Sequence, residues 1–174
     1  MFLNKDERAV DMPEKFSELK GPRGLTRLAF RLPIWFYRLH LGWILGDRFV
    51  LPTHTWRKSG MPHQTVLEVV RYDKVTGASI VASGWGTKSD WFRNVTANPK
   101  IIIQIQNKCS TAIAERLAPG AGGRELVNYD RLHPLAFAEL CHFMGYRLDG
   151  TEGDILALGK SIPIFRFLPI TNGD

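Results

Sequence analysis

The chain has 174 residues, of which 44% are hydrophobic and 23% charged, as expected of one globular domain rather than a disordered chain. Lys and Arg outnumber Asp and Glu by 23 to 17, which favours anionic partners. The basic residues are scattered along the sequence and form no recognisable nucleic-acid-binding module, so we expect no nucleic-acid partner. Cys109 and Cys141 form no CxxC motif or Cys/His cluster, so the sequence predicts free thiols, no metal site and a reducing cytoplasm.

The N-terminal region divides into two predicted segments. Residues 1–24 are polar and rich in Pro and Gly, which predicts a flexible arm ahead of one domain over residues 25–174. Apolar residues then recur at helical spacing over 25–46, with Pro33 as a kink. We favour packing of this helix in the core, with contact between residues 33–46 and a membrane surface as the alternative. No apolar stretch is long enough to span a bilayer.

The sequence pattern in the middle of the chain predicts antiparallel strands. Residues 49–55 and 64–72 are strand candidates joined by a hairpin over 57–62, and a second turn over 73–77 leads to a strand over 78–83. Glu68 lies within the apolar second strand, and we expect it to face solvent, with a binding pocket as the alternative.

The second half adds a helix, two paired strands, two further helices and a last strand. Ser89 or Asp90 is the predicted N-cap of a helix that stops at Asn98-Pro99. Strands are predicted over 100–106, 111–117 and 162–168, and helices over 125–146 and 152–160. The pattern predicts an α+β fold: a split antiparallel β-barrel of about six strands with flanking helices.

The first candidate binding segment is the basic hairpin Trp56-Arg57-Lys58-Ser59-Gly60. Two cations, a hydroxyl and turn N–H groups make an anion cradle, to which His63 adds a donor. A solvated basic hairpin is the alternative. The five histidines of the chain are dispersed, and we expect each of them to be structural or superficial.

The second candidate segment is the glycine- and tryptophan-containing loop from Ser83 to Trp91. Its glycines let a flat ligand approach the backbone, its hydroxyls offer hydrogen bonds, and the start of a helix aims N–H groups at an anion. The alternative is an ordinary glycine turn with two core tryptophans.

Together the two segments resemble the deazaflavin-dependent nitroreductase and quinone reductase family, from about residue 49 to about residue 117. That family combines a GRKSG-type hairpin with a later W-x-x-N-x-x-A-N-P motif, here Trp91, Asn94, Ala97, Asn98 and Pro99. The chain departs from the pattern at Trp56, where a glycine is usual, and at His63, where a stronger base is usual.

The resemblance implies a split barrel that binds coenzyme F(420), with FMN as the alternative cofactor. The hairpin residues would hold the phosphate and oligoglutamate tail, and the loop would border the ring. The implied cofactor-binding residues are Arg57, Lys58, Ser59, His63, Thr65, Val66, Ser83, Gly84, Trp85, Lys88, Ser89, Asp90, Trp91 and Asn94. Tyr146 and Ser83 are the candidate catalytic proton donors.

The implied activity is that of a cytoplasmic oxidoreductase, monomeric or homodimeric, that passes a hydride to a quinone, nitro compound or activated alkene. The alternative is a non-catalytic carrier that holds a flavin, haem or lipid in the same cleft.

Overall fold

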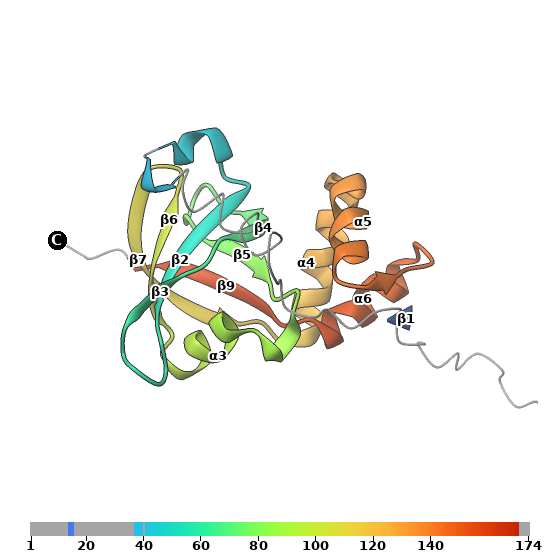
Figure 1. The fold of residues 1–174 in the computed structure, drawn as a ribbon. Coiled ribbons are helices and arrows are strands. Elements are labelled where there is room, and N and C mark those ends of the chain that lie inside the picture. Colours follow the sequence, from blue (N-terminus) through green and yellow to red (C-terminus); the bar gives the residue numbers. More distant parts are fainter. Residues whose placement is uncertain (1–13, 16–36, 40, 171–174) are drawn as a thin grey trace, which may run out of the picture.

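The computed structural model describes residues 14–15, 37–39 and 41–170, and its strands form an antiparallel barrel (Figure 1). Most of the predicted arm and of the predicted helix over 25–46 lies outside these residues, and both stay predictions. Within the described part, Glu14–Lys15 form β1, Tyr37 and Arg38 are helical, and Gly42–Leu45 form the 3-10 helix η1. No helix among the described residues is long and apolar enough to cross a membrane.

The barrel closes through one pairing between strands that are distant in the sequence. Neighbouring strands run in the order β2, β4, β5, β9, β7 and β6, and β6 pairs back with β2, while β3 extends β2 on one side. The strands are β2 Phe49–Thr55, β3 Pro62–Gln64, β4 Leu67–Tyr72, β5 Ser79–Ala82, β6 Lys100–Ile105, β7 Lys108–Arg116 and β9 Ile164–Pro169. The predicted α+β split barrel of about six strands is confirmed, and closure leaves few unpaired edges.

The strand predicted over 64–72 is divided into β3 and β4 opposite Pro52. Val50 pairs with Leu67 on one side of the gap and Thr53 with Gln64 on the other, so the register is the same on both sides. Pro52 has no N–H to donate, although its carbonyl accepts from the backbone N of Thr65 at 3.2 Å. The prediction missed the gap because its cause lies on the partner strand.

Helices close one end of the barrel and cover one side of it (Figure 1). The short helix η2 Gly86–Lys88 leads into α3 Asp90–Ala97, below the barrel. On the other side lie α4 Pro119–Leu132, α5 Pro134–Phe143 and α6 Glu152–Ser161, with β8 Tyr146–Arg147 paired to β1. The single helix predicted over 125–146 is wrong, because Pro134 begins a new helix and Pro119 starts the first one six residues early.

Two apolar cores hold these layers together. Alternate residues of β6, namely Ile101, Ile103 and Ile105, point into the barrel, where Trp91 and Phe92 of α3 close its end. The second core lies between the sheet and α4–α6, as the fully buried Leu126, Leu158 and Ile164 show.

Helices α4 and α6 cross at two glycines. A Cβ added at Gly159 would overlap the backbone of Gly123, and one added at Gly123 would lie 3.0 Å from the carbonyl oxygen of Leu156. The helices therefore approach more closely than side chains would allow. This contact explains why α4 tolerates glycines that lower its intrinsic helix propensity.

We expect Gly159→Ala to lower the free energy of unfolding by about 2–3 kcal/mol, because the new methyl group must push the two helices apart. Gly153→Ala on the same helix is the matched control, since the nearest atom to its Cβ would be Thr151 Oγ1 at 3.9 Å. That variant should be neutral or more stable by about 0.5 kcal/mol. Urea denaturation followed by circular dichroism measures both, and equal effects would contradict the close crossing.

Candidate functional site

The buried amide of Asn94 joins the basic hairpin, strand β2 and helix α3. Asn94 is 0% exposed, and its Oδ1 accepts from the backbone N of Arg57 at 3.2 Å and from Arg57 Nη1 at 3.0 Å. Its Nδ2 lies 3.1 Å from Nδ1 of His54. The two Arg57 donors fix which end of the amide is the oxygen, so Nδ2 donates to His54. The hairpin is thereby held against α3.

His54 is a structural histidine in this network, as expected from the sequence. It is 4% exposed, and because its Nδ1 accepts the Asn94 hydrogen bond, its proton lies on Nε2. Burial, with a smaller contribution from the nearby His63, lowers the pKa of His54 to about 4, and Asp90 acts in the opposite direction. His54 is therefore neutral at physiological pH.

Arg57 makes several contacts within the protein, and its predicted role as an anion ligand stays a prediction. Besides Asn94, its Nη1 donates to Asp90 at 3.2 Å, and its guanidinium lies over the Trp56 ring at 5.0 Å from the centroid. The Trp56 ring in turn packs against the His63 ring, with 4.7 Å between the ring centroids. These contacts hold the base of the hairpin rigid. Asp90, also predicted to bind the cofactor, is the ion-pair partner of Arg57.

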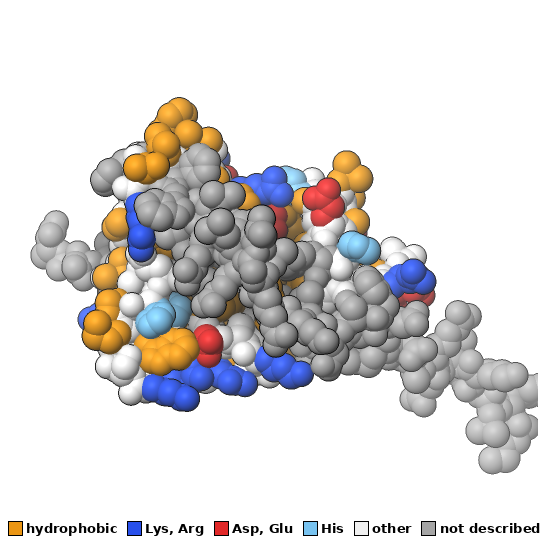
Figure 2. Space-filling view, in the orientation of Figure 1, with side chains coloured by type: hydrophobic (Ala, Val, Ile, Leu, Met, Phe, Trp, Pro, Cys, Tyr) orange, Lys and Arg blue, Asp and Glu red, His pale blue; other side chains and the backbone are white. Residues whose placement is uncertain are grey.

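The predicted anion-binding residues at the tip of the hairpin are accessible. Lys58, Ser59 and His63 are all exposed, and so is Lys88 on the neighbouring loop. Figure 2 shows Lys and Arg side chains gathered along the lower edge of the barrel, over the hairpin and α3. This surface attracts anions, and the structure places four of the predicted residues around it.

The loop after β5 is held by its own hydroxyl groups. Ser83 is 0% exposed, and its Oγ donates to the carbonyl of Gly86 at 2.8 Å and lies 3.0 Å from Ser89 Oγ. Ser89 precedes α3 but makes no side-chain capping hydrogen bond to it. Ser83 and Ser89 therefore shape the loop, and the fully buried Ser83 does not offer a proton to a ligand, contrary to the prediction.

Trp91 lies in the barrel core and does not border a ligand-binding surface. Its ring packs edge-on against Phe165 and Phe167, at centroid distances of 5.5 and 6.3 Å, and it is 6% exposed. The alternative of a core tryptophan was correct for Trp91. Gly84 and Trp85, by contrast, do line a cavity.

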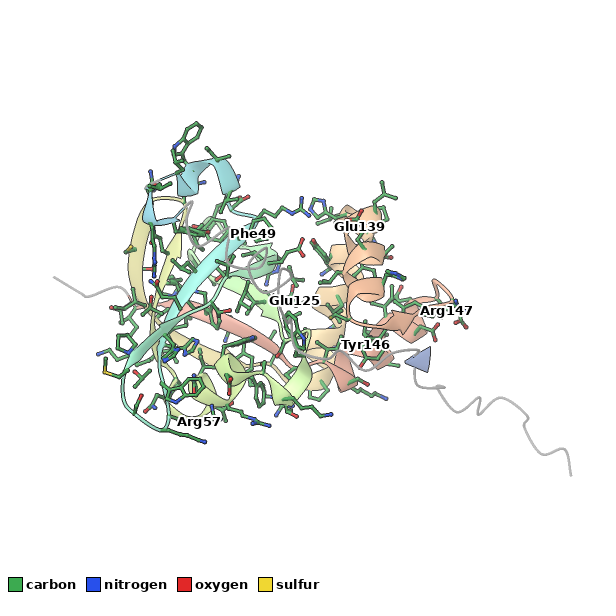
Figure 3. The ribbon with its side chains drawn as sticks, in the orientation of Figure 1. Phe49, Arg57, Glu125, Glu139, Tyr146 and Arg147 are labelled. Atoms are coloured by element: carbon green, nitrogen blue, oxygen red, sulfur yellow. The ribbon has the colours of Figure 1, made fainter. Side chains whose placement is uncertain are left out.

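This cavity, of about 480 Å³, lies between the barrel and helix α5, and we call it the ring cavity. The barrel supplies Phe49, Val66 and Glu68, and the loop supplies Gly84 and Trp85. Figure 3 shows Phe49 on the barrel and Glu139 on α5, which face each other across this region. The α5 wall consists of Ala136, Glu139, Leu140 and Met144.

Of the two predicted residues Thr65 and Val66, Val66 lines the ring cavity. Other residues that line it were not predicted from the sequence. Thr65, half-buried, lies at the gap between β3 and β4 that leads from the hairpin to the cavity. No sequence motif marks α5 as a wall, because its contribution depends on how the helix packs. The restart of the helix at Pro134 was the available signal.

Glu68 belongs to the wall of the ring cavity, which corrects the expectation that it faces solvent. Its Oε1 accepts hydrogen bonds from Arg48 Nη2 at 3.2 Å and from the Tyr129 hydroxyl at 3.0 Å. Burial and the charge of Glu68 raise the pKa of Tyr129 to about 12, so this hydroxyl remains a donor at neutral pH.

Tyr146, which was also predicted as a proton donor, does not line the ring cavity. It lines a separate cavity of about 250 Å³ with Phe137, Cys141 and Ile155 among the C-terminal helices, and Figure 3 shows it far from Arg57. Burial raises the pKa of its hydroxyl. We therefore do not carry Tyr146 into the proposed mechanism.

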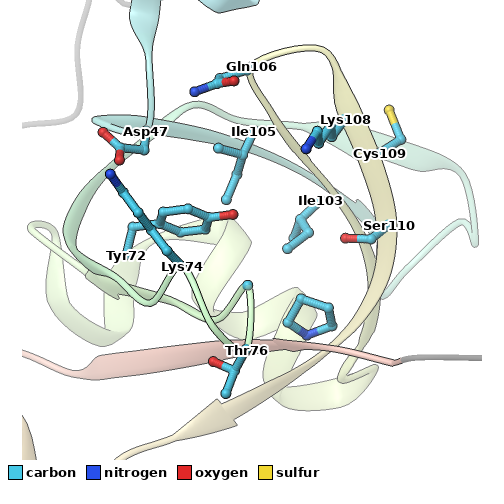
Figure 4. A pocket seen from close by; sticks show the side chains of 12 residues that line it. Asp47, Tyr72, Lys74, Thr76, Ile103, Ile105, Gln106, Lys108, Cys109 and Ser110 are labelled. Atoms are coloured by element: carbon cyan, nitrogen blue, oxygen red, sulfur yellow. The ribbon is translucent and has the colours of Figure 1, made fainter.

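Another cavity, of about 550 Å³, lies at a different part of the barrel (Figure 4). Ile103, Ile105 and Tyr72 line its inner part, and Lys74 and Lys108 lie at its exposed side. The exposed Cys109 also lines it, so this thiol is free and accessible, whereas Cys141 is buried. None of the predicted site residues lies here. No group of His, Cys, Asp and Glu side chains in the described ranges is arranged to hold a metal ion.

The low pKa of His54 predicts that the protein loses stability in acid. The unfolded chain takes up a proton near pH 6.5, whereas the folded protein takes it up only near pH 4, so stability is full above 6.5 and falls as the pH approaches 4. After allowance for solvent screening, the loss is on the order of 2 kcal/mol. His54→Gln, which keeps an acceptor for Asn94, should flatten this part of the profile in urea denaturation at pH 7, 5.5 and 4.5.

The matched control is the same substitution at His142, which is exposed on α5. His142→Gln should retain the acid-dependent loss of the unmodified chain. A His54→Gln profile as steep as that of the control would show that the buried imidazole does not account for the loss.

Several solved structures have a fold similar to that of this chain at less than 25% sequence identity. One described as an F(420)-H(2) dependent reductase is 23% identical, with 70% of this chain and 95% of that chain covered and a TM-score of 0.49. A conserved hypothetical protein from Mycobacterium tuberculosis is 13% identical, with 77% of this chain and 79% of that chain covered and a TM-score of 0.50. A protein of unknown function from Agrobacterium tumefaciens is 13% identical, with 88% and 58% covered and a TM-score of 0.50. The last two support the fold.

A comparison with curated proteins gave no match. The family model described as F(420)H(2)-dependent quinone reductase, however, matches residues 30–139, which is more than half of the chain. The matched region contains the hairpin, the loop, α3 and the barrel side of the ring cavity. The chain therefore belongs to the F(420)H(2)-dependent quinone reductase family, is an oxidoreductase, and uses coenzyme F(420) as its cofactor.

Proposed function

We propose that the protein reduces a neutral electrophilic acceptor, with a quinone favoured over a nitro compound or an activated alkene, by hydride transfer in the ring cavity. The observation that carries this proposal is the ring cavity itself, an apolar space of about 480 Å³ next to Gly84 and Trp85. Its size lies in the range of small-molecule sites, and its lining suits a flat aromatic molecule.

The hairpin tip fits the anionic tail of the coenzyme. Lys58 is an exposed cation, Ser59 offers a hydroxyl, and His63 adds a ring donor beside them on β3. The clamp that Arg57 makes with Asn94 and Asp90 prevents the hairpin from moving when an anion binds. Arg57 is thus a positioning residue, while Lys58, Ser59 and His63 contact the tail.

The loop end of the ring cavity fits the coenzyme's ring. Gly84 passes Met144 so closely that an added Cβ would lie 3.3 Å from Met144 Cγ, so any larger residue would narrow the cavity. Trp85 and Val66 provide apolar surface on the same side. Thr65 and Val66 lie between the hairpin strand β3 and the cavity. This arrangement suits a ligand that has an anionic end and a flat end.

The chain's contribution to the reaction is orientation and exclusion of water. Reduced coenzyme F(420), when bound, supplies a hydride. The apolar residues Phe49, Leu67 and Leu140 keep water away from the reacting rings, and the rigid hairpin and loop fix the position of the ring relative to the acceptor. Ser83 contributes by holding the loop, since its hydroxyl is bonded to Gly86.

Membership of the family argues against the non-catalytic carrier of a flavin, haem or lipid that the sequence left as the alternative. Reduction of menadione by reduced F(420) in the presence of the protein distinguishes the two. Turnover supports the reductase, whereas tight binding without turnover supports the carrier.

Lys58→Ala should weaken binding of coenzyme F(420) by about three- to tenfold at low salt, because it removes an exposed cation from the tail-binding hairpin. The effect should shrink as salt is added, since the contact is exposed. Titration of the coenzyme's fluorescence measures both dissociation constants.

The control is Lys108→Ala, which removes an exposed cation at the other cavity. We expect it to leave the dissociation constant unchanged. Equal weakening by the two variants would mean that overall charge, rather than the hairpin, attracts the coenzyme.

Membrane contact through η1 is part of this proposal, because a membrane quinone would be a fitting acceptor. Leu39, Trp43 and Ile44 are 64%, 62% and 52% exposed, so core packing does not explain them, and Figure 2 shows hydrophobic side chains at the top of the barrel. Exposed apolar tips beside Arg38 and Arg48 suit an anionic bilayer surface.

The double variant Trp43→Ser/Ile44→Ser should reduce co-sedimentation with vesicles that contain phosphatidylglycerol by about half or more, because it removes apolar side chains that would enter the interface. Leu135→Ser, at a site that is 82% exposed on α5, is the matched control and should pellet like the unmodified chain. Equal pelleting of all three proteins would exclude contact through η1.

A further inference from the structure

We propose that Arg48, held in place by Glu68, stabilises the negative charge that forms on the oxygen of the acceptor during its reduction. The inference rests on the proposed function and deepens it, because it assigns a role in the ring cavity to a residue outside the hairpin and the loop. It also narrows the acceptor to a class whose reduction leaves an anionic oxygen, as a quinone does.

Arg48 is anchored at the edge of the cavity by its backbone. Its carbonyl accepts from the backbone N of Val69 at 2.8 Å, and the next residue, Phe49, pairs with Glu68 across β2 and β4. Arg48, Phe49 and Glu68 all line the cavity. The start of the Arg48 side chain is therefore fixed relative to the cavity wall.

The guanidinium is oriented by Glu68. Arg48 Nη2 and Nε donate to Glu68 Oε1 at 3.2 and 3.4 Å. The same oxygen accepts from the hydroxyl of Tyr129, which is 5% exposed and comes from helix α4. Glu68 is thus held by the sheet and by a buried helix residue, and it holds the cation that faces the cavity. Tyr129 and Glu68 are positioning residues, and Arg48 is the residue that would contact the acceptor.

The charges around the cavity are suited to an acceptor that is neutral before reduction. Among the described residues that line it, Arg48 is the only cation, and Glu68 and Glu139 are the carboxylates. Glu68 balances Arg48 while the cavity is occupied by a neutral molecule. The Arg48 side chain is 60% exposed against 23% for Glu68, so the guanidinium lies on the accessible side, where an acceptor enters.

The need for a cation follows from the chemistry of quinone reduction. The quinone accepts a hydride, which is two electrons and one proton, and becomes a hydroquinone monoanion. The hydride donor is the reduced coenzyme, which is oxidised by two electrons, and water supplies the second proton that completes the hydroquinone. An oriented cation beside that oxygen stabilises the anion, although solvent screens the charge of a side chain that is 60% exposed.

Two naphthoquinones of similar size test this role without turnover. The anion of 2-hydroxy-1,4-naphthoquinone imitates the charged oxygen, and menadione is its neutral counterpart. We expect Arg48→Gln in the full chain to weaken binding of the anionic probe by about tenfold at low salt and to change menadione binding by less than about twofold. Quenching of tryptophan fluorescence measures both, since Trp85 lines the cavity.

Arg166→Gln is the matched control. Arg166 forms a similar ion pair, with Nη2 at 2.6 Å from Glu115 Oε2, between strands β9 and β7 and away from the cavity. It should leave both affinities unchanged. Tyr129→Phe, which loosens Glu68, should weaken the anionic probe less than Arg48→Gln does.

If Arg48→Gln weakened binding of both probes equally, the proposal would be overturned, because Arg48 would then only shape the cavity. Unchanged binding of both probes would overturn it as well. Binding of coenzyme F(420) by the unmodified chain is measured in parallel, because it tests the proposed function separately. If the unmodified chain does not bind the coenzyme, the proposed function fails, whereas the selectivity for the anionic probe still reports on Arg48 by itself.

Discussion

The arrangement of the site depends on the hydrogen bonds of one buried amide, that of Asn94. Its oxygen accepts from the backbone and side chain of Arg57, and its nitrogen donates to His54 on β2. A buried polar group that lost a partner would cost about 1–3 kcal/mol, so the three segments are held together strongly. Through this amide, the hairpin that we propose as the binding site of the coenzyme's tail is held on the barrel.

The strand pairing of the barrel determines which residues form the wall of the ring cavity. Closure through β2 and β6 leaves the N-terminal half of β2 to pair with β4, which brings Arg48 and Glu68 together at one cavity wall. The close crossing of α4 and α6 at Gly123 and Gly159 keeps the helical layer compact, and α5 packs on α4 to complete the opposite wall. The ring cavity therefore depends on how the helical layer packs against the barrel. The exposed Lys58 and Ser59, in contrast, belong to one hairpin.

Local patterns in the sequence predicted what depends on local structure. The alternation of Ile101, Ile103 and Ile105 correctly predicted β6 and its buried face, and the order of hairpin and loop correctly indicated the family. The patterns failed where tertiary contacts decide. The break opposite Pro52 depends on the partner strand, and the early start of α4 depends on glycines that a second helix requires.

The candidate site shows the same division. The accessibility of Lys58, Ser59 and His63 agrees with their predicted role, which remains a proposal. A motif does not reveal whether Arg57 will face a ligand or Asn94, because that depends on the partner across the fold. Residue type left both solvent and a pocket open for Glu68. The choice depends on Arg48 and Tyr129, which satisfy its charge and hydrogen bonds in the cavity wall.

The most direct test of one cleft with an anionic end and a ring end compares three ligands by fluorescence titration. These are coenzyme F(420), the same deazaflavin without its phosphate and glutamate tail, and FMN. The account predicts that the full coenzyme binds tightest and that the tail-less ring binds about tenfold more weakly or worse. Raising the salt concentration should weaken binding of the full coenzyme and leave binding of the tail-less ring unchanged. Equal, salt-independent affinity for the full and tail-less forms, or preference for FMN, would contradict it.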